Sequence, residues 1–375
     1  MNNKTQHINQ SLQSIFSLYP DEISLQVNDL GKLPKFRVKQ LLEWIFSHRE
    51  HELDKMSNLP KSFKERLASS FDWSMPEVLS KLDGSDGATK LLLRGPKQQI
   101  FEAVILRYEG RTSLCVSSQV GCKLACSFCQ TGKLGFFRNL RTEEIVGQFL
   151  LANKILEPED RKVSHIVFMG MGEPLDNFEH VIKAVNLFTR ADSYGLSARR
   201  VTVSTSGVTP KIGLLAEQAR ASLAVSLHAA RDDLRSELMP INRRYPLAVL
   251  KEELLGFQNK TGEKITIEYI LIKNKNCGIR EAKELVKFLH GLRAKVNLIP
   301  FNAHPGMDYD RPEESEILAF QKYLSKRGYP APVRYSKGLG VSAACGQLAA
   351  KHQQNLSAAP RRKSVISSPS QSHSL

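Results

Sequence analysis

The chain has 375 residues, of which 41% are hydrophobic and 24% are charged. This length suits one large domain with a smaller module, and this composition excludes wholesale disorder. No stretch approaches the roughly 18 consecutive apolar residues of a membrane span, and the N-terminal residues lack the basic and apolar regions of a secretory signal. We therefore expect a cytoplasmic protein that does not associate with membranes.

The net charge of +15 is the first feature that points to a partner. A strongly basic protein attracts polyanions, of which nucleic acid is the commonest, although charge that only maintains solubility is the alternative. Residues 1–85 contain equal numbers of acidic and basic side chains, so the excess lies after them. The Ser- and Pro-rich residues 351–375 contain basic but no acidic side chains, and are predicted to form a disordered basic tail. Candidate phosphate contacts are Lys133, Arg138, Arg141, Arg199, Arg200, Arg243 and Arg244.

Residues 1–82 are predicted to form a small helical module. Apolar side chains recur with helical spacing in residues 11–19 and 36–48. Pro60 suits the first turn of a third helix that extends to residue 71. The apolar stripes of these helices are expected to form the core of the module, so no chemistry is assigned to it at this point.

Residues 83–112 are predicted to form a short antiparallel β extension, and residues 113–350 a partial (β/α)6 barrel of the α/β class. From residue 113, apolar strand-like runs and helix-like runs alternate six times, which is typical of a parallel sheet covered by helices. Six repeats are fewer than the eight of a closed barrel, so a partial barrel or a doubly wound sheet fits. The predicted strands are 113–118, 165–170, 201–207, 222–229, 265–272 and 295–301. The predicted helices are 141–155, 177–190, 209–219, 246–260, 279–292 and 313–328.

Three of the six cysteines are clustered directly after the first barrel strand. Cys122, Cys126 and Cys129 have the spacing C-x3-C-x2-C. Three thiolates from one loop can hold three irons of a cubane iron–sulfur cluster and leave the fourth iron open for chemistry. The alternatives are zinc with a distant fourth ligand, such as Cys115 or a histidine, and three buried structural cysteines. In a reducing cytosol such a cluster favours a metal site over disulfides.

Polar residues also occur where other predicted strands end, and in α/β barrels the loops after the strands form the active site. Gly172 allows the backbone to approach a ligand closely, and Glu173 can bind an ammonium group. Each such residue alone is more often structural, but together they suit a zwitterionic nucleoside. The remaining residues of this group are Ser204, Ser226, His228 and Asn302.

Seven motifs occur in order along the chain: CVSSQVGCKLACSFCQTGKLGFFRNL, FMGMGEPLDN, VTVSTSGVTP, AVSLHA, PINRRYP, VNLIPFN and VSAACGQL. Together they resemble the RlmN-type enzymes of the RlmN/Cfr family of radical S-adenosylmethionine (SAM) RNA methyltransferases. The resemblance covers roughly residues 20–350. It implies methylation of C2 of an adenosine in the peptidyl-transferase centre of 23S rRNA, and also of the adenosine 3′ of the tRNA anticodon. It further implies that the helical module helps to hold RNA.

The resemblance also implies cofactors and residue roles. A [4Fe-4S] cluster and two SAM molecules per turnover would be used. Cys345 would accept a methyl group, Cys115 would form a disulfide with Cys345 to release the product, and Glu102 would be the proton acceptor. The implied cluster ligands are Cys122, Cys126 and Cys129, and the implied SAM ligands are Gly172, Glu173, Ser204, Ser226, Leu227, His228 and Asn302.

A monomeric state and a one-electron donor such as flavodoxin are further implications of the resemblance. Two departures from the family pattern leave open a diverged paralogue with another RNA target. Gln130 follows the third clustered cysteine where the family usually has Ala, and the segment around Lys337 lacks the family's usual Arg-Gly and acidic residue. Two further hypotheses are C8 methylation of the same rRNA adenosine, as in the antibiotic-resistance sister family, and a zinc-stabilised RNA-binding protein without catalysis.

Overall fold

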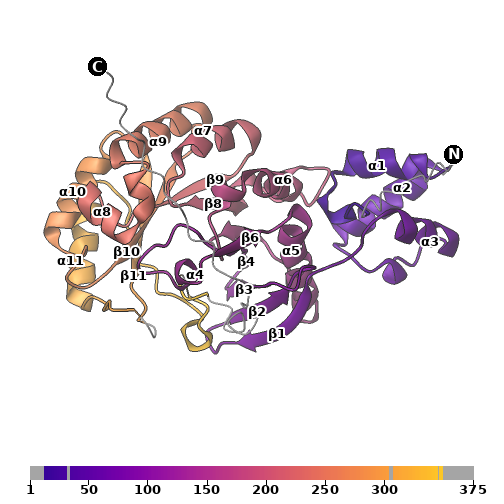
Figure 1. Cartoon of the computed structure of the whole chain (residues 1–375), viewed down its shortest axis with the longest axis horizontal. Coiled ribbons are helices and arrows are strands. Elements are labelled where there is room, and N and C mark those ends of the chain that lie inside the picture. The colour runs from indigo at the N-terminus through magenta and orange to yellow at the C-terminus, as the bar shows by residue number, and fades with distance from the viewer. Residues whose placement is uncertain (1–11, 32–33, 304–306, 345, 349–375) are drawn as a thin grey trace, which may run out of the picture.

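A computed structural model of the chain describes residues 12–31, 34–303, 307–344 and 346–348. The predicted tail 351–375 and Cys345 lie outside these residues. In the described part, helices form a module at one end of the molecule, and a curved sheet covered by helices forms the rest (Figure 1). The predicted α/β class, with an N-terminal helical region and a β extension, is confirmed.

The helical module contains α1 (Pro20–Asp29), α2 (Lys35–Leu42) and α3 (Lys61–Ser70). The predicted helix over residues 36–48 is present, and its last turn, Glu43–Ser47, is a π-helical turn. Fully buried apolar side chains from all three helices form the core of the module, as the helical spacing predicts. No helix in the described part of the chain is long and apolar enough to span a membrane.

The start of the module differs from the prediction. Of the residues predicted as a helix over 11–19, Ile15–Ser17 form a single 3-10 turn. The Ile15 N–H donates to the carbonyl of Asp72 at 3.1 Å. This N–H therefore pairs with the segment after α3 instead of with a carbonyl of a helix. The helix begins instead at Pro20, which has the φ of a first helical turn, and Glu22 accepts a hydrogen bond from the Tyr19 N–H at 2.8 Å.

The β extension is longer than predicted. Strands β1 (Glu77–Asp83), β2 (Ala88–Arg94) and β3 (Ile100–Tyr108) pair antiparallel, and β3 pairs in the same way with β4 (Arg111–Cys115). The sequence placed β1 within the helical module. Val78 and Leu82 are exposed on this edge strand, so the sequence lacks the alternation of a strand with one buried face.

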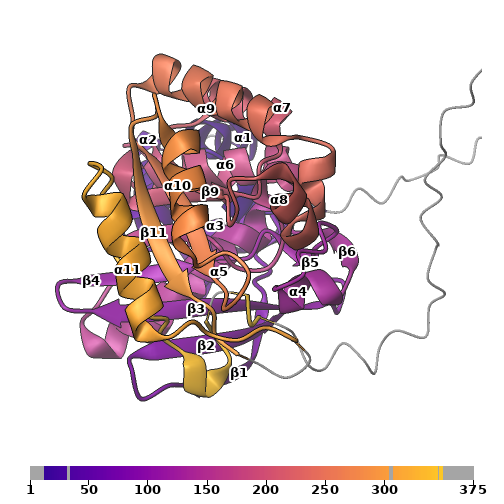
Figure 2. The same ribbon diagram turned by 90° about the vertical axis from the view of Figure 1, so that its left-hand side faces the viewer.

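The partial (β/α)6 barrel is confirmed. The sheet continues from β4 through five further parallel strands, and the helices lie on its outer face (Figures 1 and 2). The added strands, in order, are β7 (His165–Phe168), β8 (Val201–Thr205), β9 (Ser222–Ser226), β10 (Ile265–Leu271) and β11 (Ala294–Pro300). The helices are α5 (Thr142–Leu156), α6 (Phe178–Thr189), α7 (Thr209–Gln218), α8 (Asp232–Leu238), α9 (Leu247–Thr261), α10 (Ile279–Leu289) and α11 (Glu314–Ser325).

A small hairpin that was not predicted holds the cysteine loop. β5 (Gln119–Gly121) and β6 (Phe136–Asn139) pair antiparallel, with the short helix α4 (Gln130–Lys133) before β6. A Cβ at Gly121 would lie 1.9 Å from the carbonyl oxygen of Gly135, and Gly121 has a φ of +76°, so only glycine fits there. The loop therefore begins and ends on one rigid pair of strands.

The chain after α11 crosses the open side of the barrel, from the last strand back to the first. Val333 forms a bridge with Leu298 of β11. Further on, the Lys337 Nζ donates to the backbone carbonyls of Asp86 and Arg107 at 2.9 and 2.7 Å. The C-terminal segment thus connects β11 to the β extension.

Candidate active site

Side chains that face the barrel lumen alternate with side chains that pack under the helices. On β8, Val201 and Val203 are fully buried among apolar residues, whereas Thr202 and Ser204 line cavities. The lumen-facing residues of the parallel strands line two cavities. One lies at the carboxyl ends of these strands and the other near their amino ends.

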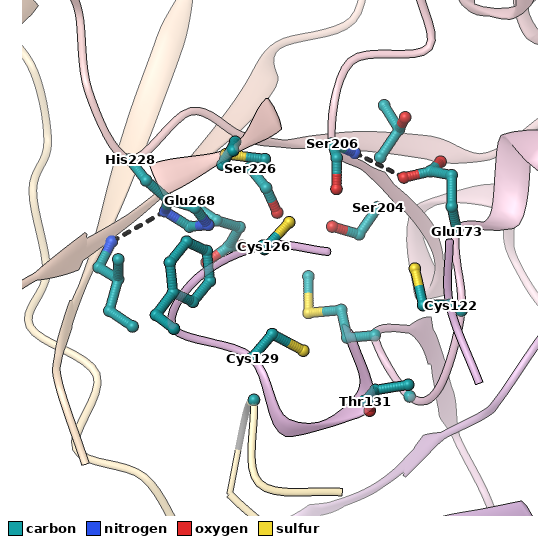
Figure 3. A pocket seen from close by; sticks show the side chains of 18 of the residues that line it. Cys122, Cys126, Cys129, Thr131, Glu173, Ser204, Ser206, Ser226, His228 and Glu268 are labelled. Carbon is teal, nitrogen blue, oxygen red and sulfur yellow. Dashed lines mark hydrogen bonds between the residues drawn. The ribbon is translucent and has the colours of Figure 1, made fainter. Parts of the chain in front are cut away.

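The carboxyl-end cavity has a volume of about 150 Å³. It collects side chains from the cysteine loop and from the ends of β7, β8, β9 and β10 (Figure 3). Of the residues predicted from the sequence, those that line this cavity are Cys122, Cys126, Cys129, Gly172, Glu173, Ser204, Ser226 and His228. The sequence therefore identified residues from four separate segments of the chain that share one cavity.

Backbone contacts fix the cysteine loop over this cavity. The Cys122 N–H donates to the Gly135 carbonyl at 2.9 Å, and the Ser127 N–H donates to the Leu238 carbonyl at 3.0 Å. Figure 3 shows the three thiols distributed around the cavity, rather than gathered at one point. In the described ranges, no three His, Cys, Asp or Glu side chains come close enough to hold a single metal ion.

The donor set of this loop fits an iron–sulfur cluster. Burial raises the pKa of Cys122 to about 12, and burial raises the pKa values of Cys126 and Cys129 as well. Neighbouring thiols add to the shift at Cys122 and Cys126, so a cationic group is needed before the cysteines become thiolates. A cubane cluster supplies that charge and presents separate irons to separate thiols.

The loop after β7 brings a carboxylate to the same cavity. Glu173 is 2% exposed, and its two oxygens accept hydrogen bonds from the N–H groups of Leu175 and Ser206 at 3.0 and 2.8 Å. Burial raises the pKa of Glu173, while these hydrogen bonds oppose the shift. Gly172 has a φ of +99°, and a Cβ there would lie 2.5 Å from the Cβ of Gln119. The close approach of the two loops therefore requires glycine.

His228 is held neutral at the end of β9. Its Nδ1 accepts a hydrogen bond from the Ile270 N–H at 3.0 Å (Figure 3). Burial, with a smaller contribution from Arg235, lowers the pKa of His228 to about 3. Since Nδ1 is an acceptor and the ring is neutral, the ring proton lies on Nε2. His228 can therefore offer one N–H donor to a ligand in the cavity that it lines.

Two predicted SAM ligands do not line the carboxyl-end cavity as the structure describes it. The Leu227 side chain packs in the apolar core, and its N–H donates to the Glu268 carbonyl at 3.0 Å. Asn302 is 8% exposed and its Nδ2 donates to the Ser336 Oγ at 2.7 Å. Neither position tests a role in binding SAM, so both assignments stay predictions.

The amino-end cavity has a volume of about 310 Å³ and a basic lining. Its cationic side chains come from the starts of β4, β8 and β11 and from the C-terminal segment. Burial lowers the pKa of His165 in this lining, and the adjacent charges of Arg111 and Arg200 lower it further. Among the described residues that line the cavity, one is acidic, Glu268. The cations are Arg111, Arg199, Arg200, Lys295, Arg334 and Lys337.

The predicted catalytic residues lie around the amino-end cavity or outside the described residues. Cys115 is 8% exposed and lines this cavity. Glu102 lies on the same face of β3 as Val104, which pairs with Cys115, and its carboxylate is 3.5 Å from the Nζ of Lys90. Cys345 is not described, but its neighbours are: Ala344 lines the amino-end cavity and Gly346 lines the carboxyl-end cavity.

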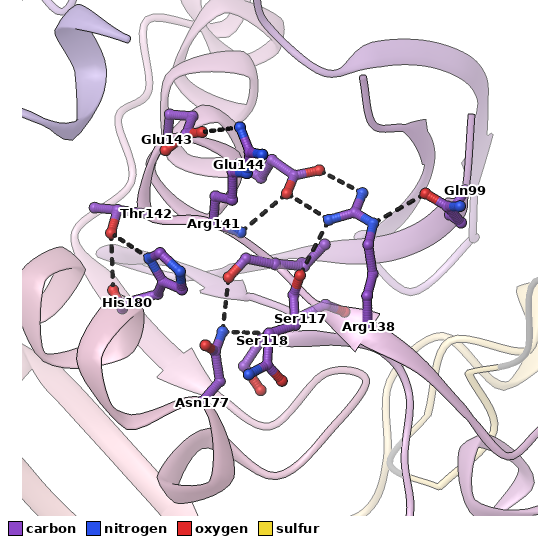
Figure 4. Close-up of polar contacts among 12 residues, drawn as sticks. Gln99, Ser117, Ser118, Arg138, Arg141, Thr142, Glu143, Glu144, Asn177 and His180 are labelled. Atoms are coloured by element: carbon purple, nitrogen blue, oxygen red, sulfur yellow. Dashed lines mark hydrogen bonds and ion pairs between the residues drawn. The ribbon is translucent and has the colours of Figure 1, made fainter. Parts of the chain in front are cut away.

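Three of the seven candidate phosphate contacts have well-defined and contrasting surroundings. Arg199 and Arg200 line the amino-end cavity. By contrast, the Arg138 guanidinium bonds to both carboxylate oxygens of Glu144 at 2.6 and 2.7 Å and to Gln99 at 2.9 Å (Figure 4). Because Glu144 is 1% exposed, this pair fixes β6 to α5 rather than presenting a charge to solvent. A phosphate contact by Arg138 is therefore not supported.

Four polar residues that line the carboxyl-end cavity were missed by the sequence analysis: Thr131, Thr205, Ser206 and Glu268. Two of them carried a signal. Ser206 continues the lumen-facing alternation of Thr202 and Ser204, and Glu268 is the one acid in a mostly apolar strand. Thr131 is fixed by its hydroxyl, which donates to the Leu348 carbonyl at 2.7 Å, and no local pattern predicts that contact.

Comparisons with known proteins agree with the geometry. Residues 17–72 match the ribosomal RNA large subunit methyltransferase N-terminal domain, and residues 116–289 match the radical SAM superfamily. The dual-specificity RNA methyltransferase RlmN of a Nitratiruptor species is 43% identical over 357 residues, which cover 91% of this chain and 98% of the relative. The RlmN of Agrobacterium fabrum is 41% identical over 364 residues, 91% of this chain and 89% of the relative.

A solved structure is similar over nearly the whole chain. The crystal structure of a radical SAM methyltransferase from Sphaerobacter thermophilus superposes with a TM-score of 0.86 at 39% sequence identity. The match covers 90% of this chain and 99% of that chain. The helical module, the β extension and the barrel are therefore a shared architecture.

Proposed function

The chain belongs to the RlmN family of dual-specificity RNA methyltransferases, and from this we propose that it methylates C2 of an adenosine in 23S rRNA and of the adenosine 3′ of the tRNA anticodon. One observation carries the proposal. A single barrel lumen has three half-buried thiols of one loop at its carboxyl end, and a set of cations with a further cysteine at its amino end. The first suits a radical cofactor and the second suits RNA.

In this proposal the carboxyl-end cavity holds the cofactors. Cys122, Cys126 and Cys129 would hold a [4Fe-4S] cluster, which together with SAM supplies, when bound, the methyl group and the one-electron chemistry that an unreactive aromatic carbon requires. Glu173 would accept a hydrogen bond from the ammonium group of SAM, and His228 would donate one from Nε2. Gly172 would let the backbone approach this ligand closely. Ser204 and Ser226 would add hydroxyl contacts to the same ligand.

The protein's own residues would carry the methyl carbon and release it. Cys345 would hold the methyl group on sulfur. The methyl carbon would lose one hydrogen atom to the one-electron chemistry that the bound cofactors supply, and would then bond to C2 of the adenine. Cys115 would attack the sulfur of Cys345. The S–S bond forms, the C–S bond breaks, and the electron pair of the broken bond stays with the product carbon, which takes up a proton to complete the methyl group. Glu102 would take the proton that leaves the base, and Lys90, 3.5 Å away, would stabilise the anionic form of its carboxyl group.

The amino-end cavity would admit the RNA base. Its cations, which include Arg199 and Arg200, would neutralise flanking phosphates while the adenine extends into the lumen. Cys115 and Ala344, the residue before Cys345, line this cavity. Their position supports entry of the base from the amino ends of the strands. The helical module would supply further contacts to folded RNA.

Nucleoside mass spectrometry tests the proposal. Anaerobically reconstituted protein, reductant and SAM are incubated with 23S rRNA or tRNA from cells that lack the enzyme, and the RNA is digested to nucleosides. We expect 2-methyladenosine with the wild type and none with Cys345→Ala. Product from Cys345→Ala would refute the methyl-carrying role. The appearance of 8-methyladenosine would assign the chain to the sister activity. Colourless protein with bound zinc would refute the enzyme assignment.

A further inference from the structure

The two cavities meet at four residues that line both of them. In the described ranges these residues are Met169, Glu268, Ile299 and Leu348. Three are apolar, and Glu268 is the one polar group among them. The junction is also where a base that enters from the amino end would reach the cofactors. A buried carboxyl group at this place is not used by the mechanism proposed above.

Glu268 is fixed by its position on β10. It lies in register with Ser226 of β9 on one side and with Asn297 of β11 on the other. The Asn297 Nδ2 donates to Glu268 Oε1 at 2.8 Å, and both side chains are buried, with exposed fractions of 2% and 5%. Figure 3 shows Glu268 beside His228 at the wall of the carboxyl-end cavity. Its direction is therefore set by the sheet and not by a mobile loop.

The environment of Glu268 calls for a further hydrogen-bond donor. No described Lys, Arg or His comes within 4.0 Å of its carboxylate to form an ion pair. The cations that act on it from farther away, Arg334 and Lys295, belong to the amino-end cavity. A buried carboxyl group with one amide partner is costly, and a ligand that donates a hydrogen bond offsets that cost.

We propose that Glu268 binds the exocyclic amino group of the adenine that is methylated, and so selects and orients this base at the junction of the two cavities. The inference rests on the proposed function. An amino group is the donor that adenine presents, and a carboxyl oxygen accepts from it whether or not the carboxyl group is protonated. A site built to bind such a group rejects bases that lack it, because its buried acceptor is then left unpaired.

The adenine of SAM has the same amino group, so the experiment must separate the two sources. RNA affinity is measured by fluorescence anisotropy with a hairpin that has adenosine or purine riboside, which lacks the amino group, at the target position. SAM affinity is measured by calorimetry on the same reconstituted protein. Both are equilibrium measurements that need no turnover. The variants are Glu268→Leu and, as a control for the lost charge, the exposed Glu263→Gln.

We expect the wild type and Glu263→Gln to bind the adenosine hairpin about 10-fold to 100-fold more tightly than the purine hairpin, the size of a hydrogen bond to a charged group. Glu268→Leu should bind the two hairpins equally, with unchanged SAM affinity. This ratio is measured within one variant, so a general loss of folded protein does not alter it. Discrimination retained by Glu268→Leu would overturn the proposal.

Loss of SAM affinity with discrimination retained would assign Glu268 to the cofactor's adenine and overturn the proposal as well. Failure of the proposed function has a different signature. In that case the wild type transfers no methyl group to RNA. The hairpin ratio, by contrast, tests Glu268 alone.

Discussion

The two cavities of the barrel lumen differ in the burial and in the charge of the side chains that line them. At the carboxyl end, Glu173 and His228 are almost fully buried, and each accepts hydrogen bonds from backbone N–H groups that fix its orientation. At the amino end, the lining is cationic and belongs to the starts of strands and to the C-terminal segment. The comparison teaches that one lumen combines a buried, rigid cavity, in which we propose that the cofactors bind, with a cationic cavity, which we propose admits RNA. Four predictions test that separation.

The largest effect is expected from Cys126→Ala. Loss of one of three thiol ligands should remove most of the iron and abolish methylation, because a cluster held by two cysteines is not retained. RNA affinity should stay within about twofold of the wild type, since the amino-end cavity is untouched. Iron analysis and anisotropy measure the two effects. A parallel loss of RNA binding would show that the cavities are not separate units.

Cys115→Ala should block release of the product rather than formation of its bond to the protein. The methyl carbon of Cys345 would bond to the adenine, but no thiol could then form the disulfide that frees it. We expect a covalent protein–RNA species on denaturing gels, with catalysis limited to less than one turnover. The exposed surface substitution Lys326→Ala is a matched control that should leave no such species. Free methylated RNA over many turnovers would remove Cys115 from this role.

The double substitution Arg199→Ala/Arg200→Ala should weaken RNA binding roughly tenfold at low salt. Each lost phosphate contact lowers the slope of log affinity against log salt by about 0.7 to 0.9. SAM affinity and iron content should be unchanged. Arg220→Ala removes an exposed cation outside the cavity and should leave the slope unchanged. An unchanged slope in the double variant would show that RNA does not enter at the amino-end cavity.

The smallest effect concerns His228 and pH. Burial lowers its folded pKa to about 3, whereas an unfolded histidine titrates near 6.5. The unfolded state therefore binds a proton first as pH falls below 6.5, and stability is lost over that window, by at most about 1.4 kcal/mol per pH unit from this group. Urea unfolding at pH 7 and pH 5 should show a smaller loss in His228→Asn than in the wild type. Equal losses would contradict the burial argument.

The sequence predicted the carboxyl-end cavity well and the amino-end cavity poorly, for a physical reason. Cys122, Gly172 and Ser204 lie in short motifs at strand ends, where parallel connectivity brings loops together whatever their spacing along the chain. Arg111, Lys295 and Arg334 stand in no motif, and only the curvature of the sheet and the path of the C-terminal segment bring them to one place. Arg138 shows the converse, since a cation inside a motif proved to be paired with a buried acid.

The accuracy of the secondary-structure prediction also depended on whether an element has a local sequence pattern. The parallel strands and the longer helices of the barrel were placed within a few residues, whereas α1 and the short helix α8 were not predicted. Strand β1 was missed because this exposed edge strand has no buried face, so its sequence lacks an alternation of apolar and polar residues. The helix predicted over residues 11–19 was wrong because a tertiary backbone bond to Asp72 outweighed a local pattern.

The C-terminal segment delays completion of the fold until the end of protein synthesis. The Lys337 ammonium bonds to a carbonyl 251 residues earlier, and the Thr131 hydroxyl bonds to a carbonyl 217 residues later. A chain emerging from the ribosome can form the helical module and most strands, but it lacks the closing contacts until its last residues are made. In this RNA-modifying enzyme, the candidate active site is therefore the part of the molecule that is completed last. A translation product truncated before residue 345 would contain the cysteine loop but lack Cys345, the residue that we propose receives the methyl group.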